Sequence, residues 1–209
     1  MKVYADIDIS LDGYIAGPDI SKEHPLGRGG EQLIWYGDDV NDSSTEFESV
    51  YAKNDAIVLE ESAHAEGAVI MGQNTFDVSI ESWGEDPPIH KPCFVLTNTP
   101  RPKLVRGDTS FAFVTTGVKD AIEQAITAAK EKDVCVMGGA YTIAECINAG
   151  LLDELHLHIV PVLLGDGLRL FDGMDAGKTF EKVRVLEGEK ATHFVLREGK
   201  AVRTNSGVR

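Results

Sequence analysis

Alternation of apolar and polar residues marks several short segments of the chain as β-strands. In the first, residues 2–11, the alternating sets are Val3, Ala5, Ile7 and Ile9 on one side and Tyr4, Asp6, Asp8 and Ser10 on the other. Side chains on one face of a strand recur at every second residue, so this spacing predicts a strand. Further strands are predicted at residues 68–71, 93–96, 111–114, 134–137, 154–160, 180–186 and 192–196. We expect the last two to form a closing β-hairpin.

Apolar residues recur at helical spacing in the segments between these strands. The clearest amphipathic pattern covers residues 118–129. Two further helices are predicted at residues 54–65 and 140–147, and they are followed by Gly67 and Gly150, where helices often end in glycine. Strands that alternate with helices and end in a hairpin predict an α/β fold, in which a mixed sheet is covered by helices on both faces.

A long polar segment, residues 19–45, interrupts this order. It is rich in Gly, Asp, Asn and Ser and has no sustained period, so it is predicted to be a loop. Loops of this length usually cover a functional site or move. Trp35 and Tyr36 lie within it. This aromatic pair can cap a planar ligand or pin the loop to the core, and the tendency of aromatic rings to be buried favours the second role.

The size of the chain suits a single domain. Its 209 residues, 43% of them hydrophobic, suffice for one large core, so we expect one domain over residues 1–197 and a polar tail at 198–209. The longest apolar run, near residues 159–165, is interrupted by Pro161 and is too short to span a membrane. The N-terminal segment reaches an acidic residue at Asp6, which is not the pattern of a secretory signal.

Most of the formal net charge of −14 lies in the first third of the chain. Residues 1–66 contain 15 acidic and 4 basic residues, a net charge of −11. An acidic surface repels nucleic acid and anionic lipid, so neither is expected as a main partner. The exception is a cationic segment, residues 91–106, which holds Lys91, Arg101, Lys103 and Arg106 and no acidic residue. An anionic ligand would be expected to bind there.

The cysteines and histidines favour neither a disulfide framework nor a metal centre. Cys93, Cys135 and Cys146 are odd in number and form no CxxC pair, which fits a reduced, cytoplasmic protein. His156 and His158 would share one face of a strand, which can bind a metal, but no third ligand with suitable spacing accompanies them. A polar strand face is therefore favoured, and no metal is expected.

Three of the predicted strands end in glycine or in small polar residues. These ends are Gly72-Gln73-Asn74-Thr75, Thr97-Asn98-Thr99 and Gly138-Gly139-Ala140. Ligands of parallel sheets bind at the carboxyl ends of strands, and a strand–glycine–helix turn offers N–H groups to a phosphate. The three ends together favour one groove for a long phosphate-bearing ligand such as a dinucleotide. Taken alone, the Gly138-Gly139 pair could equally be a tight turn that binds nothing.

Five motifs follow one another in an order and spacing that resemble a known superfamily. They are SLDG at 10–13, VIMGQNTF at 69–76, VLTN at 95–98, VMGG at 136–139 and HIVPVLLGDGLRLF at 158–171. In this order they resemble the dihydrofolate reductase superfamily, and within it the branch that contains the C-terminal reductase domain of the riboflavin-biosynthesis deaminase–reductase. The resemblance covers residues 2–197. No deaminase domain precedes the motifs, so we expect a stand-alone reductase-like domain.

The resemblance implies a three-layer fold, with a central, mostly parallel mixed sheet, and a groove for NADPH. It assigns Gly138, Gly139 and Ala140 to the pyrophosphate, with Tyr141 and Thr142 nearby and with Gly72, Asn74 and Thr75 on the opposite side. It assigns Thr97, Asn98 and Arg101 to the adenosine 2′-phosphate. Ser10 and Gly13 are assigned to the nicotinamide. It also implies a small-molecule substrate and a homodimer.

Two positions depart from the family pattern. Members commonly carry Arg after the glycine of the Met-Gly motif, facing the 2′-phosphate. Here this residue is Gln73, so NADH stays open beside NADPH, and Arg101 or Lys103 can substitute for the missing cation. Folate-reducing members also place an acid in the first helix, and no acid of this chain, Asp55 included, can be assigned to that role.

The sequence therefore predicts an NADPH-dependent reductase that transfers a hydride to a C=N or C=O group of a small, heterocyclic molecule. Asp12 is the first candidate proton donor because it adjoins the expected nicotinamide site, although an Asp before Gly13 is also a common turn former. Tyr14 or a bound water are alternative donors, and Tyr14 and Trp35 are candidate substrate contacts. The alternative function is a catalytically weak or inactive dinucleotide-binding protein of the same fold.

Overall fold

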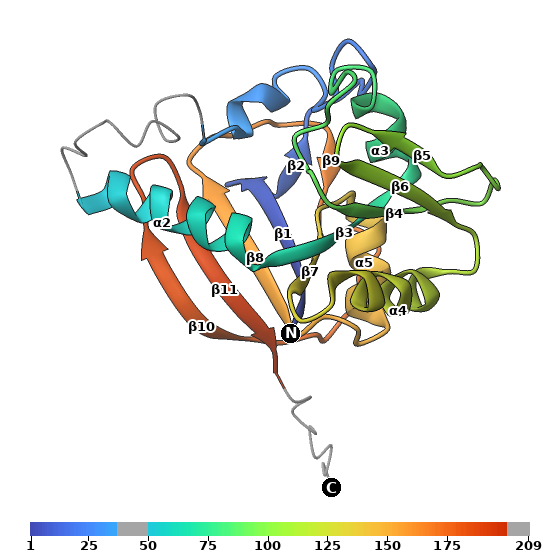
Figure 1. Ribbon diagram of the computed structural model, residues 1–209. Helices are drawn as coiled ribbons and strands as arrows, with labels where there is room; N and C mark the ends of the chain where they lie inside the picture. Colours follow the sequence, from blue (N-terminus) through green and yellow to red (C-terminus); the bar gives the residue numbers. More distant parts are fainter. Residues whose placement is uncertain (37–49, 200–209) are drawn as a thin grey trace, which may run out of the picture.

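A computed structural model describes residues 1–36 and 50–199, and its centre is a mixed sheet (Figure 1). The strands of this sheet are β1 (Val3–Ser10), β3 (Glu66–Gly72), β4 (Pro92–Leu96), β5 (Leu104–Arg106), β6 (Thr109–Val114), β7 (Asp133–Val136), β8 (Glu154–Val160), β10 (Phe180–Glu187) and β11 (Thr192–Glu198). They lie side by side in the order β10-β11-β8-β1-β7-β3-β4-β6-β5. Two short strands, β2 (Tyr14–Ala16) and β9 (Leu168–Arg169), pair with each other outside it.

Parallel pairing dominates the middle of the sheet. The strands β8, β1, β7, β3, β4 and β6 are each parallel to their neighbours within this run. Antiparallel pairs close both edges, β5 against β6 on one side and the β10–β11 hairpin against β8 on the other. The carboxyl ends of the parallel strands therefore meet along one edge, as the prediction of a ligand groove requires.

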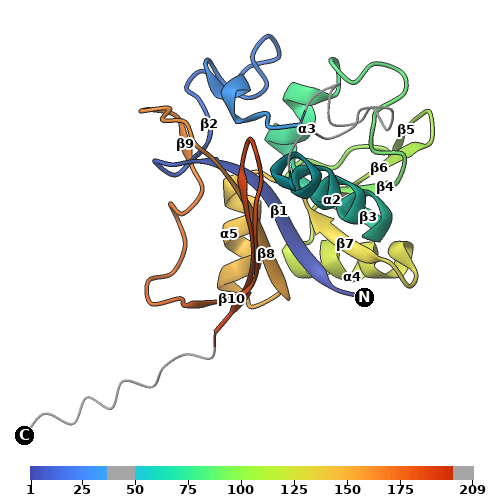
Figure 2. The same ribbon diagram turned by 90° about the vertical axis from the view of Figure 1, so that its left-hand side faces the viewer.

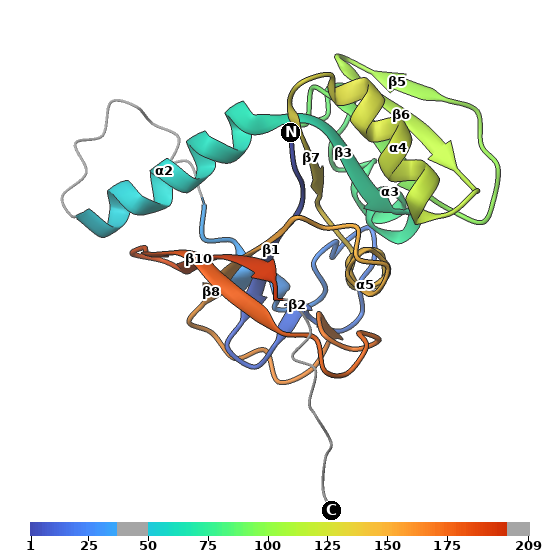
Figure 3. The ribbon, with the colours of Figure 1, turned by 90° about the horizontal axis from the view of Figure 1, so that it is seen from below.

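Helices cover both faces of the sheet. They are α2 (Val50–Ala65), α3 (Gln73–Ser79), α4 (Val118–Ala129) and α5 (Ala140–Asn148), with a short 3-10 helix, η1, at Gly30–Leu33. Successive residues of β3 point to opposite faces of the sheet, and each face meets different helices. Val69 and Met71 pack with α3, whereas Ala68 and Ile70 pack with α4 and α5. Figures 1 and 3 show α2 on the β10 side of the molecule, and Figures 2 and 3 show α4 beside β3 and β7. Within the described residues, no helix is both long and apolar enough to cross a membrane.

The structure confirms the predicted fold class, including the closing hairpin and the helices on both faces. The helix predicted at 118–129 has these bounds, whereas α2 begins at Val50 rather than at residue 54. Strands β2, β5 and β9 were not predicted, because two or three residues are too few to show an alternating pattern. Residues 37–45 of the predicted loop, the approach to α2 at 46–49 and residues 200–209 of the predicted tail lie outside the described residues.

Burial of the apolar face of α4 makes a testable contribution to stability. Ile122 is 4% exposed and packs in the main core, whereas its neighbour Glu123 is exposed. We expect Ile122→Ala to lower the free energy of unfolding by about 3 kcal/mol, because a buried cavity replaces packed atoms. Urea unfolding of the two variants measures this, with Glu123→Ala as the matched surface control. Equal effects of the two substitutions would contradict the placement of α4 against the sheet.

Candidate active site

A groove of about 550 Å³ runs along the carboxyl ends of β3, β4 and β7. All three polar strand ends singled out in the sequence line it, because parallel pairing brings them to one edge of the sheet. The sequence-predicted cofactor residues in its wall are Gly72, Gln73, Asn74, Thr75, Thr97, Asn98, Gly138, Gly139, Ala140, Tyr141 and Thr142. The volume of this groove and its course past three strand ends suit an extended ligand.

Glycines let the ends of β3 and β7 approach each other closely in the middle of the groove. The Gly72 amide donates to the Gly138 carbonyl oxygen at 2.9 Å. A Cβ atom at position 72 would lie 2.8 Å from the Thr142 hydroxyl, and the φ angle of Gly138, +136°, would strain any side chain there. The Thr75 hydroxyl faces this turn, 3.5 Å from where a Cβ of Gly139 would lie. Backbone atoms therefore form this part of the groove wall.

Helix α5 begins at the same turn and presents its N-terminus to the groove. Its first residues, Ala140, Tyr141 and Thr142, line the groove wall. The N–H groups in the first turn of a helix have no acceptor within the helix, and with the positive end of the helix dipole they suit an anion such as a pyrophosphate. Tyr141 is 75% exposed at this rim, whereas Thr142 is buried.

The β3–β4 end of the groove holds an interlocked set of polar side chains, Gln73, Asp77, Thr97 and Arg101. The Thr97 hydroxyl donates to Gln73 Oε1, and Gln73 Nε2 donates to Asp77 Oδ2 at 3.1 Å. Arg101 binds both oxygens of the Asp77 carboxylate, at 2.6 and 3.1 Å. These Arg101 hydrogen bonds hold the pKa of Asp77 below its usual range. Arg101 therefore lies beside the groove rather than in its lining.

The cationic segment at 91–106 does not form a single anion site, which corrects the prediction made for it. Lys91 binds Glu66 at 2.8 Å, at the amino end of β4 and away from the groove. Arg106 donates to two backbone carbonyl oxygens beyond α3, at 2.8 and 2.9 Å. Like Arg101, which pairs with Asp77, these two cations already donate hydrogen bonds to acceptors within the protein.

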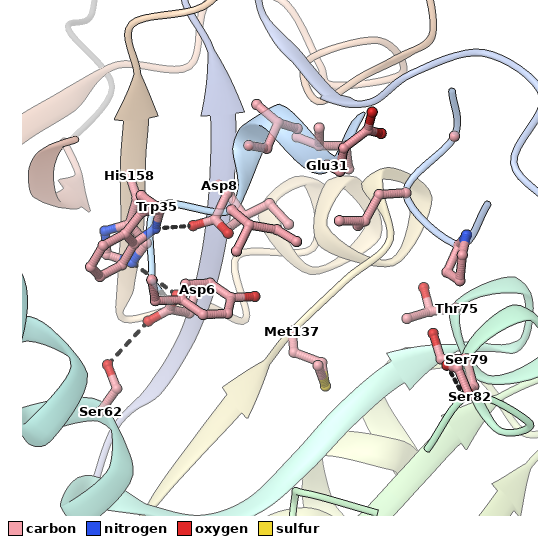
Figure 4. A pocket seen from close by; sticks show the side chains of 18 of the residues that line it. Asp6, Asp8, Glu31, Trp35, Ser62, Thr75, Ser79, Ser82, Met137 and His158 are labelled. Carbon is pink, nitrogen blue, oxygen red and sulfur yellow. Dashed lines mark hydrogen bonds and ion pairs between the residues drawn. The ribbon is translucent and has the colours of Figure 1, made fainter. Parts of the chain in front are cut away.

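A second cavity, of about 800 Å³, adjoins the groove (Figure 4). The two spaces share the wall residues Ile7, Ile15, Pro25, Leu26, Thr75, Ser79 and Met137. In Figure 4, Met137 lies between the acids of β1 on one side and Thr75 and Ser79 on the other. The groove and the cavity therefore adjoin along this shared wall.

Two acids of β1, Asp6 and Asp8, point into this cavity from one face of the strand (Figure 4). Trp35 donates its indole N–H to Asp8 Oδ1 at 2.6 Å. Burial raises the pKa of Asp8 to about 6, and this effect outweighs the lowering by His158 and by Trp35. Asp8 can therefore hold and release a proton near neutral pH, which is what a general acid requires.

Asp6 begins a buried chain of hydrogen bonds that leads away from the cavity. His158 Nε2 lies 2.9 Å from Asp6 Oδ1. The Nδ1 atoms of His158 and His193 are 2.8 Å apart, and His193 Nε2 lies 2.8 Å from Asp55 Oδ1. His158, His193 and Asp55 are each 2–3% exposed. This chain joins β1, β8, β11 and α2.

The hydrogen-bond count fixes how many protons the two histidines share. Each Nε2 atom needs a hydrogen to donate to its carboxylate, and the bond between the two Nδ1 atoms needs one more. With both carboxylates ionised, the two rings together carry one positive charge. Burial lowers the pKa of both histidines, but Asp6 raises that of His158 above its usual range, whereas that of His193 stays lowered. The charge therefore resides on His158, where it lowers the pKa of Asp6 against the opposing effect of burial.

Asp55, to which the sequence analysis assigned no role, ends this chain and fastens α2 to the hairpin. Its Oδ2 atom accepts the backbone N–H groups of Glu189 and Lys190 at 3.0 and 3.2 Å. His158 is thus committed to hydrogen bonds with Asp6 and His193 rather than to a metal. Within residues 1–36 and 50–199, no three or more His, Cys, Asp or Glu residues are grouped so as to hold a metal ion.

Trp35 takes the second of the two roles that the sequence left open, and its contact with a planar ligand stays a prediction. It is 2% exposed and packs with Leu33, Val160 and Ala191, which confirms that it pins the loop to the core. Its ring also forms part of the cavity wall and holds Asp8. Tyr36 is 42% exposed at the edge of the same cavity.

The SLDG turn lies outside the described walls of both spaces, and its expected place beside the nicotinamide stays a prediction. Asp12 accepts hydrogen bonds from the Ser10 hydroxyl at 2.6 Å and from the amides of Leu164 and Gly165. The Ser10 bond is the main cause that lowers the pKa of Asp12 to about 2, so this carboxyl is a poor proton donor. Neither Ser10, Asp12, Gly13 nor Tyr14 is in the wall of the groove or of the cavity.

Tyr14 serves the same local framework. Its hydroxyl accepts a hydrogen bond from Arg169 at 2.9 Å, and the Arg169 guanidinium lies over its ring at 4.3 Å. Tyr14 is 7% exposed and pairs with Arg169 across β2 and β9, so its role as a substrate contact stays a prediction. The neighbouring Ile15 and Ala16 line the groove in its place.

Sequence reasoning missed Asp6, Asp8 and His193. The available signal was the presence of two acids within the first strand, because a carboxyl group buried in a central strand is costly unless it is paired or used. The alternating pattern identified the polar face of this strand but not what that face meets. His193 and Asp55 are 138 residues apart, so nothing local in the sequence links them.

Comparisons with known proteins identify a family whose model matches most of the chain. A family model described as RibD C-terminal domain matches residues 1–194. A protein of Shewanella sp. PV-4, whose name assigns it to riboflavin biosynthesis, has 25% sequence identity and a TM-score of 0.67, with 96% of this chain and 100% of that chain covered. The uncharacterized protein YyaP of Bacillus subtilis is 31% identical over an alignment of 121 residues, with 49% of this chain and 58% of YyaP covered.

Two more distant structures share the fold. Dihydrofolate reductase of Enterococcus faecalis, solved with NADP(H) and RAB-propyl, has 15% identity and a TM-score of 0.55, with 95% and 97% of the two chains covered. The deaminase and reductase of Thermotoga maritima that acts on diaminohydroxyphosphoribosylaminopyrimidine and 5-amino-6-(5-phosphoribosylamino)uracil has 15% identity and a TM-score of 0.58, with 95% of this chain and 56% of that one covered.

The hydrogen bond from Trp35 to Asp8 gives a direct test of the cavity. Trp35→Phe keeps an aromatic ring but removes the N–H donor, so we expect the pKa of Asp8 to rise above about 6. Carbon-13 NMR titration of the aspartate carboxyl groups measures the shift. Tyr36→Phe, which removes a hydroxyl at the cavity edge, is the control and should leave this pKa in place. A pKa that stays the same or falls in Trp35→Phe would refute the assigned contact.

Proposed function

This chain belongs to the RibD C-terminal domain family, and from that premise we propose that it is a reductase that uses a nicotinamide dinucleotide to reduce a C=N or C=O group of a small molecule. The observation that supports the proposal is the wall that the groove shares with the cavity that holds Asp8. One space suits a phosphate-bearing cofactor, and the other offers a carboxyl group that can give up a proton. Hydride and proton transfer to a double bond needs both.

The residues of the groove fit such a cofactor. The wall at Gly72, Gly138 and Gly139 is backbone that a Cβ atom would obstruct or strain, and the N-terminus of α5 suits the pyrophosphate. Thr75 faces the same turn from the other side. When bound, a reduced nicotinamide supplies the hydride. The residues shared by the two spaces, Met137 among them, would orient it toward the cavity and exclude water.

Asp8 takes the role of proton donor that the sequence analysis gave to Asp12. Its carboxyl group faces the cavity, and burial keeps it protonated to a higher pH than an ordinary aspartate. Trp35 fixes its position through Oδ1. After transfer the charged carboxylate remains in the cavity until it takes up another proton.

The charge of the cavity favours a substrate without phosphate. The acidic and histidine residues in its wall are Asp6, Asp8, Glu23, Glu31, Glu66, His24 and His158, with neither Lys nor Arg among the described lining residues. A phosphate there would meet several carboxylates, and the positive charge of His158 already faces Asp6. An uncharged or cationic planar molecule, with N–H groups for the carboxylates and a face for Trp35, suits this wall better.

The alternative, a catalytically weak or inactive dinucleotide-binding protein, had two supports in the sequence: Gln73 and the lack of an assignable acid in the first helix. Asp8 of β1 offers a different acid, which supports the catalytic proposal. The homodimer and the cytoplasmic location stay predictions, and light scattering in solution tests the first.

Fluorescence titration with NADH and NADPH tests the first step of this function. We expect at least one of them to bind with a saturable change in tryptophan emission, because Trp35 and Trp83 line the cavity. Oxidation of the bound cofactor against dihydropterins, ribityl pyrimidines and carbonyl compounds then separates an enzyme from a binding protein. No binding of either dinucleotide at millimolar concentration would overturn the proposal.

Asp8→Asn tests the proton donor once a substrate of that panel is found. We expect kcat to fall about 100-fold, because general acid catalysis is lost, while cofactor affinity is kept. The wild-type rate should decline as pH rises above about 6, since the carboxyl group loses its proton there. This decline should be absent in Asp8→Asn. Asp12→Asn, the same change at the acid outside the cavity, should retain most of the activity; the opposite ranking would return the role to Asp12.

A further inference from the structure

We propose that the adenosine end of the groove excludes a 2′-phosphate, so that the protein takes NADH in preference to NADPH. This inference rests on the proposed function, because it concerns the same groove. The adenosine end is the β3–β4 side. The hydride-accepting cavity lies at β1, the pyrophosphate turn at β7, and β3 and β4 follow in that direction across the sheet.

The lining of the groove offers no positive charge to a phosphate dianion. Among the described residues in its wall there is no Lys, Arg or His, and the ionisable ones are Tyr141 and Glu145. Backbone N–H groups at the start of α5 can serve the pyrophosphate, but they lie at the other strand end. A second phosphate near β4 would therefore lack a charged partner.

The nearest cation at this end is already neutralised. The two terminal nitrogens of the Arg101 guanidinium donate to the two carboxylate oxygens of Asp77, at 2.6 and 3.1 Å. Such bidentate pairs are among the strongest charge-assisted hydrogen bonds. Asp77 is itself held as an anion, since Arg101 lowers its pKa. An incoming phosphate would have to displace a carboxylate or lie beside it.

Gln73 supplies the neutral surface that a ribose hydroxyl needs. Its amide is held at both ends, with Oε1 accepting from Thr97 and Nε2 donating to Asp77. Thr97 and Asn98 complete this rim. Amide and hydroxyl groups can both donate hydrogen bonds to a 2′-hydroxyl and accept them from it, and none of these groups is charged.

Two further cations lie in the surroundings. Lys22 contributes to the lowered pKa of Asp77, and Lys103 is exposed in the segment after β4. Neither is in the wall of the groove or of the cavity. The charged groups around the site are thus Asp77, Arg101, Lys22 and Lys103, and the carboxylate lies between Gln73 and the guanidinium.

Equilibrium titrations of the full chain with NADH and with NADPH, without substrate, test the inference. Tryptophan emission and cofactor emission report binding independently of turnover. We expect NADH to bind at least about ten-fold more tightly than NADPH, because the extra phosphate loses water without gaining a partner. Binding of neither cofactor would overturn the proposed function. Equal affinities, or tighter binding of NADPH, would overturn this inference alone, and Lys22→Gln would then show whether Lys22 is the cation responsible.

Two variants test whether the named residues cause the preference. Gln73→Arg should raise the affinity for NADPH about ten-fold and change that for NADH little, because it adds a cation at the rim. Asp77→Asn should do the same by removing the anion and releasing Arg101. The gain in Asp77→Asn should vanish in the double variant Asp77→Asn/Arg101→Gln. Thermal unfolding and circular dichroism establish that each variant is folded. An unchanged NADPH affinity in folded Gln73→Arg and Asp77→Asn would contradict the assignment.

Discussion

The buried chain of hydrogen bonds from Asp6 through His158 and His193 to Asp55 is the interaction on which the candidate site depends. It joins a central strand, a neighbouring strand, the closing hairpin and α2, none of which adjoins the next in sequence. Its charges are removed from water, so each group needs its neighbour, and loss of one partner would leave an uncompensated charge at a cost of about 3–5 kcal/mol. Asp6 is the cavity end of this chain. The contacts that hold α2 and the hairpin in place therefore also keep the Asp6 carboxylate in position, two residues before Asp8.

Topology supplies the other half of the site. Parallel pairing of β1, β7, β3 and β4 brings their carboxyl ends to one edge, where glycines and small polar residues leave a groove. The two halves differ in charge because different elements build them. Backbone, hydroxyl and amide groups line the groove, whereas the acids of β1 and the loop before α2 line the cavity. This division supports three parts of one site. The groove has a neutral end for the adenosine and an anion-binding turn in the middle, and the cavity supplies the proton donor.

Periodicity and strand-end chemistry were sufficient to predict the fold and the groove. The alternating first strand, the helix at 118–129 and the three polar strand ends are local patterns, and the structure brings those ends together. The acid chemistry could not be predicted in this way. A period of two shows that Asp6 and Asp8 share a face, but only packing shows that this face meets Trp35 and a cavity rather than solvent. Asp12 was preferred because it belongs to the motif that the resemblance places beside the nicotinamide, and its hydrogen bonds to the distant segment at 164–165 show it as part of a turn. Likewise, the charge of Arg101 is visible in the sequence but its partner Asp77 is not.

Met137 reports most directly on the central claim, that groove and cavity are one space joined at the reactive end of a bound dinucleotide. Its side chain lies at the junction, whereas Met174 packs on the far core and lines neither space. With carbon-13-labelled methionine methyl groups, NMR spectra recorded during a titration with NADH should show a saturable shift of the Met137 resonance, because the nicotinamide ring would lie against it. The Met174 resonance should stay in place. Saturable binding that leaves the Met137 methyl signal unmoved would contradict the account.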